Sequence, residues 1–109
     1  AVRRIKTPHA DVYFHNGFLS VEECVALCTL IDTNRRPSTL LIAAKDPNFR
    51  TSESCDMDRF SSLVQPIDER IAALLGLDPP LGETMQGQRY APGQHFRAHH
   101  DYFHEGQPY

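Results

Sequence analysis

Two segments of the chain place apolar residues at the three- and four-residue spacing of an amphipathic helix. The first opens with Ser20-Val21-Glu22-Glu23, a capping box in which the Ser20 hydroxyl accepts from the Glu23 amide and the Glu23 carboxylate accepts from the Ser20 amide. The segment Asn34-Arg35-Arg36-Pro37 ends this helix. Its apolar stripe predicts one buried face made of Val21, Cys24, Val25, Cys28 and Ile31.

The second helix is predicted to begin at Gln65-Pro66, because a proline at the first helical position lacks only an amide that the helix does not use. Gly76 supplies its C-terminal stop. Its buried stripe is predicted to consist of Ile67, Ile71, Leu74 and Leu75.

Short β-prone segments lie around these helices. Residues 12–14 before the turn-like Asn16-Gly17, and residues 39–43, are strand candidates. Asp78-Pro79-Pro80 predicts an extended connection. After it, the turn signature Ala91-Pro92-Gly93 separates two further predicted strands, at residues 84–90 and 94–103. The pattern therefore predicts an α+β fold in which residues 1–83 form a helical support with short strands and residues 84–109 hold the first core strands.

Composition and charge narrow the class of protein. The chain has 109 residues, 40% hydrophobic and 23% charged, which suits one small core in a single domain or a piece of one. Its longest apolar runs, residues 40–44 and 71–75, are far shorter than the roughly 20 residues that cross a bilayer, which argues against a membrane protein. A net charge of −3 and a pI near 6.0 provide no basic surface for phosphate backbones, so a nucleic-acid partner is disfavoured.

The three cysteines make an odd count, and we expect reduced thiols and a cytoplasmic location. Cys24 and Cys28 are spaced to lie one helical turn apart on the same face, as buried apolar residues do. The alternative for this Cys-x-x-x-Cys spacing is a metal or redox pair.

The sequence His99-His100-Asp101 carries the candidate chemistry. In an extended strand, residues two apart point to the same face with Cα atoms roughly 6.5 Å apart, so His99 and Asp101 can converge on one metal ion while His100 points away. An imidazole and a carboxylate, joined by a second imidazole from elsewhere, form the facial triad of non-haem iron(II) oxygenases. The three remaining coordination positions suit bidentate 2-oxoglutarate and dioxygen. Taken alone, His-x-Asp is a weak signal in a chain with six histidines, and the alternative is a surface pair.

The surrounding residues resemble a known family. From Tyr90 to Phe103 the chain fits the pattern Tyr-x-x-Gly-x-x-aromatic-x-x-His-x-Asp-Tyr-Phe of the catalytic domain of prolyl 4-hydroxylases. Three upstream features appear in the same order as in the family. They are Phe18-Leu19-Ser20 before a helix, then Arg50-Thr51-Ser52, then a helix from Pro66 that ends before Gly76-Leu77.

The resemblance implies that N-terminal helices pack on part of a double-stranded β-helix core of the jelly-roll or cupin type. It implies a dioxygenase that hydroxylates a peptidyl proline or a small molecule, using iron(II) and 2-oxoglutarate and releasing succinate and CO2, with ascorbate as a further expected requirement. His99 and Asp101 are the implied metal ligands and catalytic residues, and Tyr90 is implied to hold 2-oxoglutarate. Arg50 and Phe96 are implied to line the substrate groove. Phe96 stands where prolyl hydroxylases commonly carry tyrosine, so a hydrogen bond from that hydroxyl to the substrate is absent here.

In the family, the second iron-binding histidine and a basic anchor for 2-oxoglutarate lie many residues after the His-x-Asp block. Only residues 102–109 follow that block here. We therefore expect the natural protein to continue past Tyr109, and residues 1–109 alone to be inactive. The rival hypothesis is a non-catalytic metal- or peptide-binding module on the same scaffold. A nucleic-acid demethylase is a weaker alternative because of the acidic balance.

Overall fold

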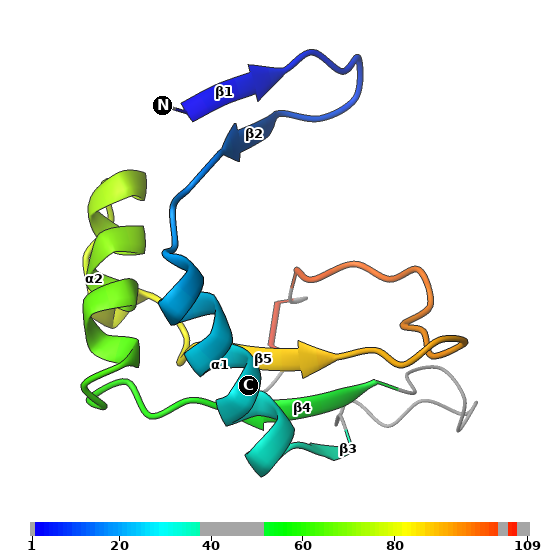
Figure 1. Ribbon diagram of the computed structural model, residues 1–109. Helices are drawn as coiled ribbons and strands as arrows, with labels where there is room; N and C mark the ends of the chain where they lie inside the picture. The colour runs from blue at the N-terminus through cyan, green and yellow to red at the C-terminus, as the bar shows by residue number, and fades with distance from the viewer. Residues whose placement is uncertain (1, 38–51, 103–104, 107–109) are drawn as a thin grey trace.

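The computed structural model describes residues 2–37, 52–102 and 105–106. Two helices and two small antiparallel sheets make up this part of the chain (Figure 1), in agreement with the predicted α+β class. The predicted double-stranded β-helix stays a prediction. The candidate strand at residues 39–43 lies outside the described residues. Within the described ranges, no helix combines the length and apolarity needed to cross a bilayer.

An N-terminal hairpin is formed by β1 (Val2–Ile5) and β2 (Val12–His15), which pair antiparallel from Val2 opposite His15 to Ile5 opposite Val12. The prediction of a strand at residues 12–14 is confirmed, whereas β1 was not predicted because Arg3 and Arg4 interrupt its apolar pattern. In Figure 1 the hairpin stands apart from the second sheet. Its strand residues are exposed apart from the half-buried His15.

The first helix, α1 (Val21–Asn34), begins and ends where the sequence predicts. The Ser20 Oγ accepts from the Glu23 amide at 3.1 Å, and the Ser20 amide donates to Glu23 Oε1 at 2.9 Å, so the predicted capping box is confirmed. The predicted buried face is wrong except at Ile31, which is half-buried. Val21 is 76% exposed and Val25 is 60% exposed, and both α1 cysteines are also exposed. The half-buried side consists instead of Glu23, Ala26, Leu27, Leu30 and Ile31.

The sheet against which α1 packs determines which face of the helix is half-buried. A Cβ on Gly87 of β5 (Gln86–Arg89) would lie 2.4 Å from Ile31 Cγ1 and 2.8 Å from Met57 Cε, so only glycine permits this approach of helix to strand. From the neighbouring strand β4 (Glu53–Asp56), the Cys55 Sγ–H donates to the Leu30 carbonyl at 3.7 Å. These two contacts between distant parts of the chain set the rotation of α1 about its axis.

The second sheet has the order β3-β4-β5, where β3 is Arg36–Pro37, and both pairings are antiparallel. Residues that are directly opposite share a face of the sheet. The face toward α1 holds Cys55 opposite Gly87 and Glu53 opposite Arg89. The face away from α1 carries Arg36, Ser54, Asp56, Gln86 and Gln88. This sheet therefore has one packed side and one polar side.

The second helix, α2 (Val64–Leu75), buries Val64 and Ile67 completely, and these two residues belong to the buried core together with Cys55 and Met57. It begins two residues earlier than predicted at Pro66, which occupies the third helical position, where its missing amide still costs the helix no bond. Gly76 ends the helix at φ +69°, as predicted.

Two predictions for α2 and the chain after it fail. Leu74 is 47% exposed and Leu75 is 62% exposed, so the predicted buried stripe is confined to the first half of α2, with Ile71 half-buried. Only Asp78 of Asp78-Pro79-Pro80 is extended. Residues Pro79–Leu81 form the short 3-10 helix η1, which the φ of proline also permits.

The turn after β5 forms as predicted. Gln94 N donates to the Ala91 carbonyl at 2.9 Å, and Pro92 followed by Gly93 at φ +86° matches a type II turn. The predicted strand at residues 94–103 is wrong over its described part, residues 94–102, which contains only an isolated bridge at Phe96. The assumed pairing of Tyr90 with His95 is also absent, since neither residue is assigned to a strand or a bridge.

Candidate metal and cosubstrate site

His99 is oriented by contacts within its own segment. Its Nδ1 lies 2.7 Å from the carbonyl oxygen of Arg97. A carbonyl only accepts hydrogen bonds, so Nδ1 carries the hydrogen and a neutral ring presents the lone pair of Nε2. The ring also stacks on Phe96, with centroids 3.9 Å apart and planes at 14°. This is the second-shell arrangement that fixes the tautomer of metal-binding histidines, with a backbone carbonyl on one nitrogen and the other directed to the ion.

Asp101 lies on the Nε2 side of that ring. The distance from His99 Nε2 to Asp101 Oδ1 is 3.2 Å, and the Asp101 side chain is 94% exposed. Two ligand atoms that are each about 2.1 Å from one ion, at a right angle, lie about 3.0 Å apart. The two atoms are therefore spaced as neighbouring ligands of a single ion. The same spacing is compatible with an ion pair when the imidazole is protonated.

The neighbouring side chains point the other way. His100 stacks on Tyr102, with ring centroids 4.0 Å apart and planes at 17°. Residues 99 and 101 thus meet on one side of the chain, and residues 100 and 102 meet on the other, as in an extended backbone. Alternation of this kind depends on the local backbone, so it is present although residues 97–102 are not assigned to a strand.

Tyr90 follows β5 on the polar side of the second sheet. Its hydroxyl donates to Gln88 Oε1 at 3.3 Å, and the residue is 45% exposed. The same side carries Ser54, which is 1% exposed. Next to it, Gln86 Nε2 donates to Asp56 Oδ1 at 3.0 Å. Hydroxyl and amide donors of this kind suit the recognition of a carboxylate or a peptide group.

Asp56 is the charged member of this polar side. The hydrogen bond from the Gln86 amide, followed by the hydrogen bond and the positive charge of Arg36, lowers its pKa from the ordinary value. The carboxylate is thus kept ionised and paired in the folded protein. Asp56 holds Gln86 and Arg36 in place at the edge of the polar side.

The comparisons with known proteins decide the family. Over 101 residues the chain is 35% identical to the probable prolyl 4-hydroxylase 8 of Arabidopsis thaliana. The aligned residues make up 88% of this chain and 34% of that relative. Over 95 residues it is 32% identical to prolyl 4-hydroxylase 1 of the same plant, covering 81% of this chain and 34% of the relative. The chain belongs to a prolyl 4-hydroxylase-like family.

A putative prolyl 4-hydroxylase of Acanthamoeba polyphaga mimivirus is also similar, at 25% identity over 97 residues, which is 89% of this chain and 40% of the relative. No family model matches this prolyl 4-hydroxylase-like chain, and no solved structure matches it significantly. The chain spans about a third of the length of the plant relatives.

Of the site residues predicted for this prolyl 4-hydroxylase-like chain, His99 and Asp101 lie together and Phe96 stacks on His99. Tyr90 lies on the polar side of the sheet. Arg50 lies outside the described residues. In the described part of the chain, no group of three His, Cys, Asp or Glu side chains is arranged to hold a metal ion, so His99 and Asp101 form at most part of a coordination sphere there.

The polar side chains that share a face of the sheet with Tyr90 were not predicted from the sequence. Gln86, Gln88 and Tyr90 recur every second residue, and that period is itself the signal of a shared face of a strand. This period did not predict a site because glutamine on a strand is usually a solvated surface side chain.

Proposed function

We propose that the protein to which this chain belongs is an iron(II)- and 2-oxoglutarate-dependent dioxygenase that hydroxylates a peptidyl proline or a small molecule, with release of succinate and CO2. The observation that carries this proposal is the His99–Asp101 pair, with Nε2 and Oδ1 3.2 Å apart, in a chain of a prolyl 4-hydroxylase-like family. Relatives named as prolyl 4-hydroxylases support the hydroxylase activity.

The two side chains fit an iron(II) ion as two of its three protein ligands. Imidazole nitrogen and carboxylate oxygen are the donors of the iron facial triad. The hydrogen bond of His99 to the Arg97 carbonyl fixes the tautomer that coordination requires. When bound, iron would activate dioxygen, which is the oxidant, while 2-oxoglutarate would supply two electrons as it is converted to succinate and CO2, and the carbon atom of the substrate would supply the other two.

The polar side of the sheet is proposed to hold 2-oxoglutarate. The Tyr90 hydroxyl is a donor to a carboxylate, and Gln88 already orients that hydroxyl at 3.3 Å. Arg50 is proposed to hold a substrate carbonyl or carboxylate through its forked guanidinium.

Phe96 is proposed to face the substrate with an apolar ring. Its stack on His99 ties the position of the ring to that of the ligand. Because it lacks the hydroxyl that prolyl hydroxylases commonly carry, it favours an apolar portion of the substrate over a hydrogen-bonded one. Ascorbate dependence and a cytoplasmic location complete the proposal.

The metal part of the proposal is tested on this chain by anaerobic titration with iron(II), followed through the paramagnetic shifts of the imidazole resonances. We expect the His99 resonances to move first, and Asp101→Asn to abolish the effect. The matched control is His100→Ala, which removes an adjacent imidazole that faces Tyr102. If His100→Ala removed the response and Asp101→Asn did not, the assignment of the ligands would be wrong.

The catalytic part is tested in the complete natural protein that carries this chain. We expect iron-dependent release of succinate from 2-oxoglutarate, abolished by His99→Ala or Asp101→Ala and retained by His100→Ala. Iron binding without succinate release, with or without candidate substrates, would identify the non-catalytic module instead.

A further inference from the structure

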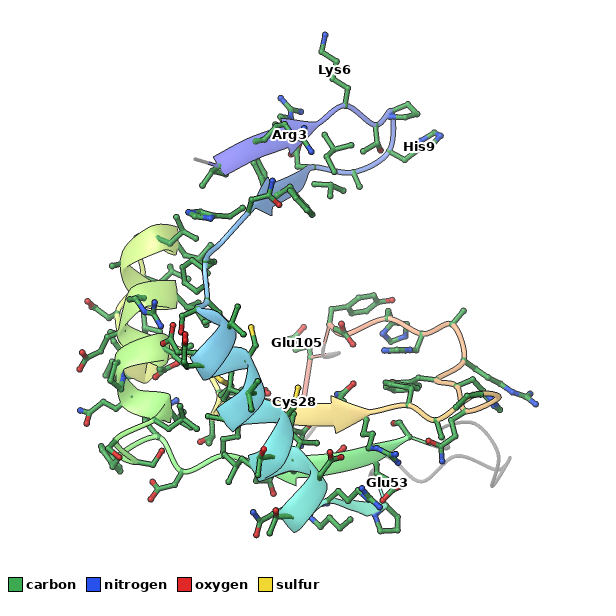
Figure 2. All side chains as sticks on the ribbon, viewed as in Figure 1. Arg3, Lys6, His9, Cys28, Glu53 and Glu105 are labelled. Carbon is green, nitrogen blue, oxygen red and sulfur yellow. The ribbon has the colours of Figure 1, made fainter. Side chains whose placement is uncertain are left out.

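The exposed side of α1 carries two thiols. Cys24 and Cys28 are both exposed, and they border Val21 and Val25, which are 76% and 60% exposed. Figure 2 shows the Cys28 side chain leaving α1 on the side turned away from α2. Both thiols are therefore accessible on one side of a single helix in the part of the chain that the structure describes.

The spacing of the pair favours a bridged site over a disulfide. Residues four apart on a helix have Cβ atoms about 5–6 Å apart. A disulfide brings its Cβ atoms to about 3.8 Å, which would distort the helix between Cys24 and Cys28. An ion placed between two sulfur atoms lengthens the bridge by a second bond, so it spans the pair while α1 keeps its geometry.

The two sulfur ligands by themselves suit a particular kind of ion. Among residues 2–37, 52–102 and 105–106, no group of three His, Cys, Asp or Glu side chains includes the two thiols. Asp32, one turn beyond Cys28, is engaged with Arg35 and Arg89, each at 3.3 Å. Tetrahedral zinc would need four ligands. A monovalent d10 ion is satisfied by two thiolates in a linear arrangement, and thiolates select such soft ions.

We propose that Cys24 and Cys28 form a two-thiolate site for a thiophilic monovalent d10 cation, of which copper(I) is the probe, on the exposed side of α1. Binding converts two S–H groups to two copper–sulfur bonds and transfers two protons to solvent, while copper stays in its +1 state. Because the thiolate is the ligand, binding strengthens as the pH rises.

The third cysteine provides an internal reference. Cys55 is 1% exposed, and its Sγ–H donates to the Leu30 carbonyl, on the packed side of α1. It is therefore separated from the pair by the helix. In the folded chain we expect two thiols to react rapidly with a thiol reagent, and the third to react only after denaturation.

The test is an anaerobic titration of the chain with copper(I) against a chromophoric competitor, combined with counting of reactive thiols. We expect one copper(I) per chain and protection of both rapid thiols. Cys24→Ala and Cys28→Ala should each weaken binding more than roughly 100-fold, since even a lost outer-shell partner costs about 10–100-fold. Both positions are exposed and alanine favours helix, so circular dichroism should be unchanged.

The matched control moves one thiol and keeps the number of cysteines. Cys24→Ala combined with Glu22→Cys leaves two exposed thiols roughly 120° apart around α1, where one ion cannot join them. This variant should bind as weakly as Cys24→Ala. Binding as tight as in the original chain, copper-linked dimers in place of a one-to-one complex, or two thiols that resist the reagent would each overturn the proposal.

The site is independent of the proposed iron centre. His99→Ala should leave copper(I) binding within about twofold of the original affinity, because α1 and residues 94–102 share no ligand. A loss of copper(I) binding in His99→Ala would overturn the assignment to the cysteines without bearing on succinate release.

Discussion

Two regions of this chain hold their side chains by different means. In the region of α1, β4, β5 and α2, positions are set by contacts between residues distant in sequence, such as Gly87 against Ile31 and Cys55 against the Leu30 carbonyl. Among the described residues, the contacts that position His99 in residues 94–102 are local: with the Arg97 carbonyl, with Phe96 and with Asp101.

The two regions contribute differently: the packed region mainly determines stability, and residues 94–102 determine the placement of the ligand atoms. The first region contains the completely buried residues and resists changes of volume, as close-packed interiors do. The second region brings two ligand atoms to 3.2 Å through the alternation of an extended backbone. We therefore expect changes in the first region to alter the free energy of unfolding, and changes in the second to alter metal binding.

The largest effect on stability is expected for Ile67→Ala in α2. Ile67 is 2% exposed, and truncation of a buried isoleucine lowers the free energy of unfolding by roughly 2–5 kcal/mol. Leu75 on the same helix is 62% exposed, so Leu75→Ala should change the free energy of unfolding by less than about 0.5 kcal/mol. Urea denaturation followed by circular dichroism measures both. Equal losses in the two variants would remove the distinction between the packed and open ends of α2.

Gly87→Ala should have the next largest effect. The new Cβ would lie 2.4 Å from Ile31 Cγ1, and overpacking of this kind typically costs about 1–3 kcal/mol. Gly82→Ala is the matched control, because its Cβ would meet only the Pro79 carbonyl oxygen at 3.6 Å, an ordinary contact. The free energy of unfolding from urea titrations should fall for the first variant and stay level for the second.

A double-mutant cycle sharpens the same point. Ile31→Ala removes both atoms of Ile31 that the new Cβ approaches. The double variant Gly87→Ala with Ile31→Ala should therefore lose less free energy than the sum of the single variants. Strict additivity would show that the cost at Gly87 does not arise from its contact with α1.

The sequence predicted those features that depend on neighbouring residues. The capping box of Ser20 and Glu23, the helix stop at Gly76 and the turn at Pro92-Gly93 are local hydrogen-bonding and dihedral requirements, and all three are confirmed. The side-by-side placement of His99 and Asp101 is local in the same sense. Their role as iron ligands stays a prediction.

The failures concern features that require a partner elsewhere in the chain. The α1 sequence carries two apolar stripes, one with Val21 and Val25 and one with Leu27 and Leu30, and only the approach of Gly87 to Ile31 selects the second. Residues 99–102 alternate as a strand does, but within the described ranges β5 pairs with β4 and not with this segment. The residue pattern of a segment does not show whether another strand is available to pair with it.

The smallest expected effect lies at the cap of α1 and appears on acidification. Hydrogen bonding of the Glu23 carboxylate to the Ser20 amide, followed by the hydrogen bond and charge of Arg70, lowers the Glu23 pKa below its ordinary 4.5. The resulting stability is fully present above that unfolded value and is lost as pH falls through the folded pKa. Glu23→Gln keeps a side-chain oxygen for the Ser20 amide and removes the charge, so its urea midpoint should fall less on acidification.

Asp56→Asn is the companion variant, because Gln86 and Arg36 lower the pKa of Asp56 in the same direction. The Glu23→Gln, Asp56→Asn double variant should show the flattest dependence of the urea midpoint on pH. Iron(II) binding at His99 and Asp101, measured at neutral pH, should be the same in this double variant as in the original chain, since neither carboxylate belongs to residues 94–102. A parallel loss of iron(II) binding would mean that the packed region also sets the ligand geometry, and the two regions would then have to be treated as one.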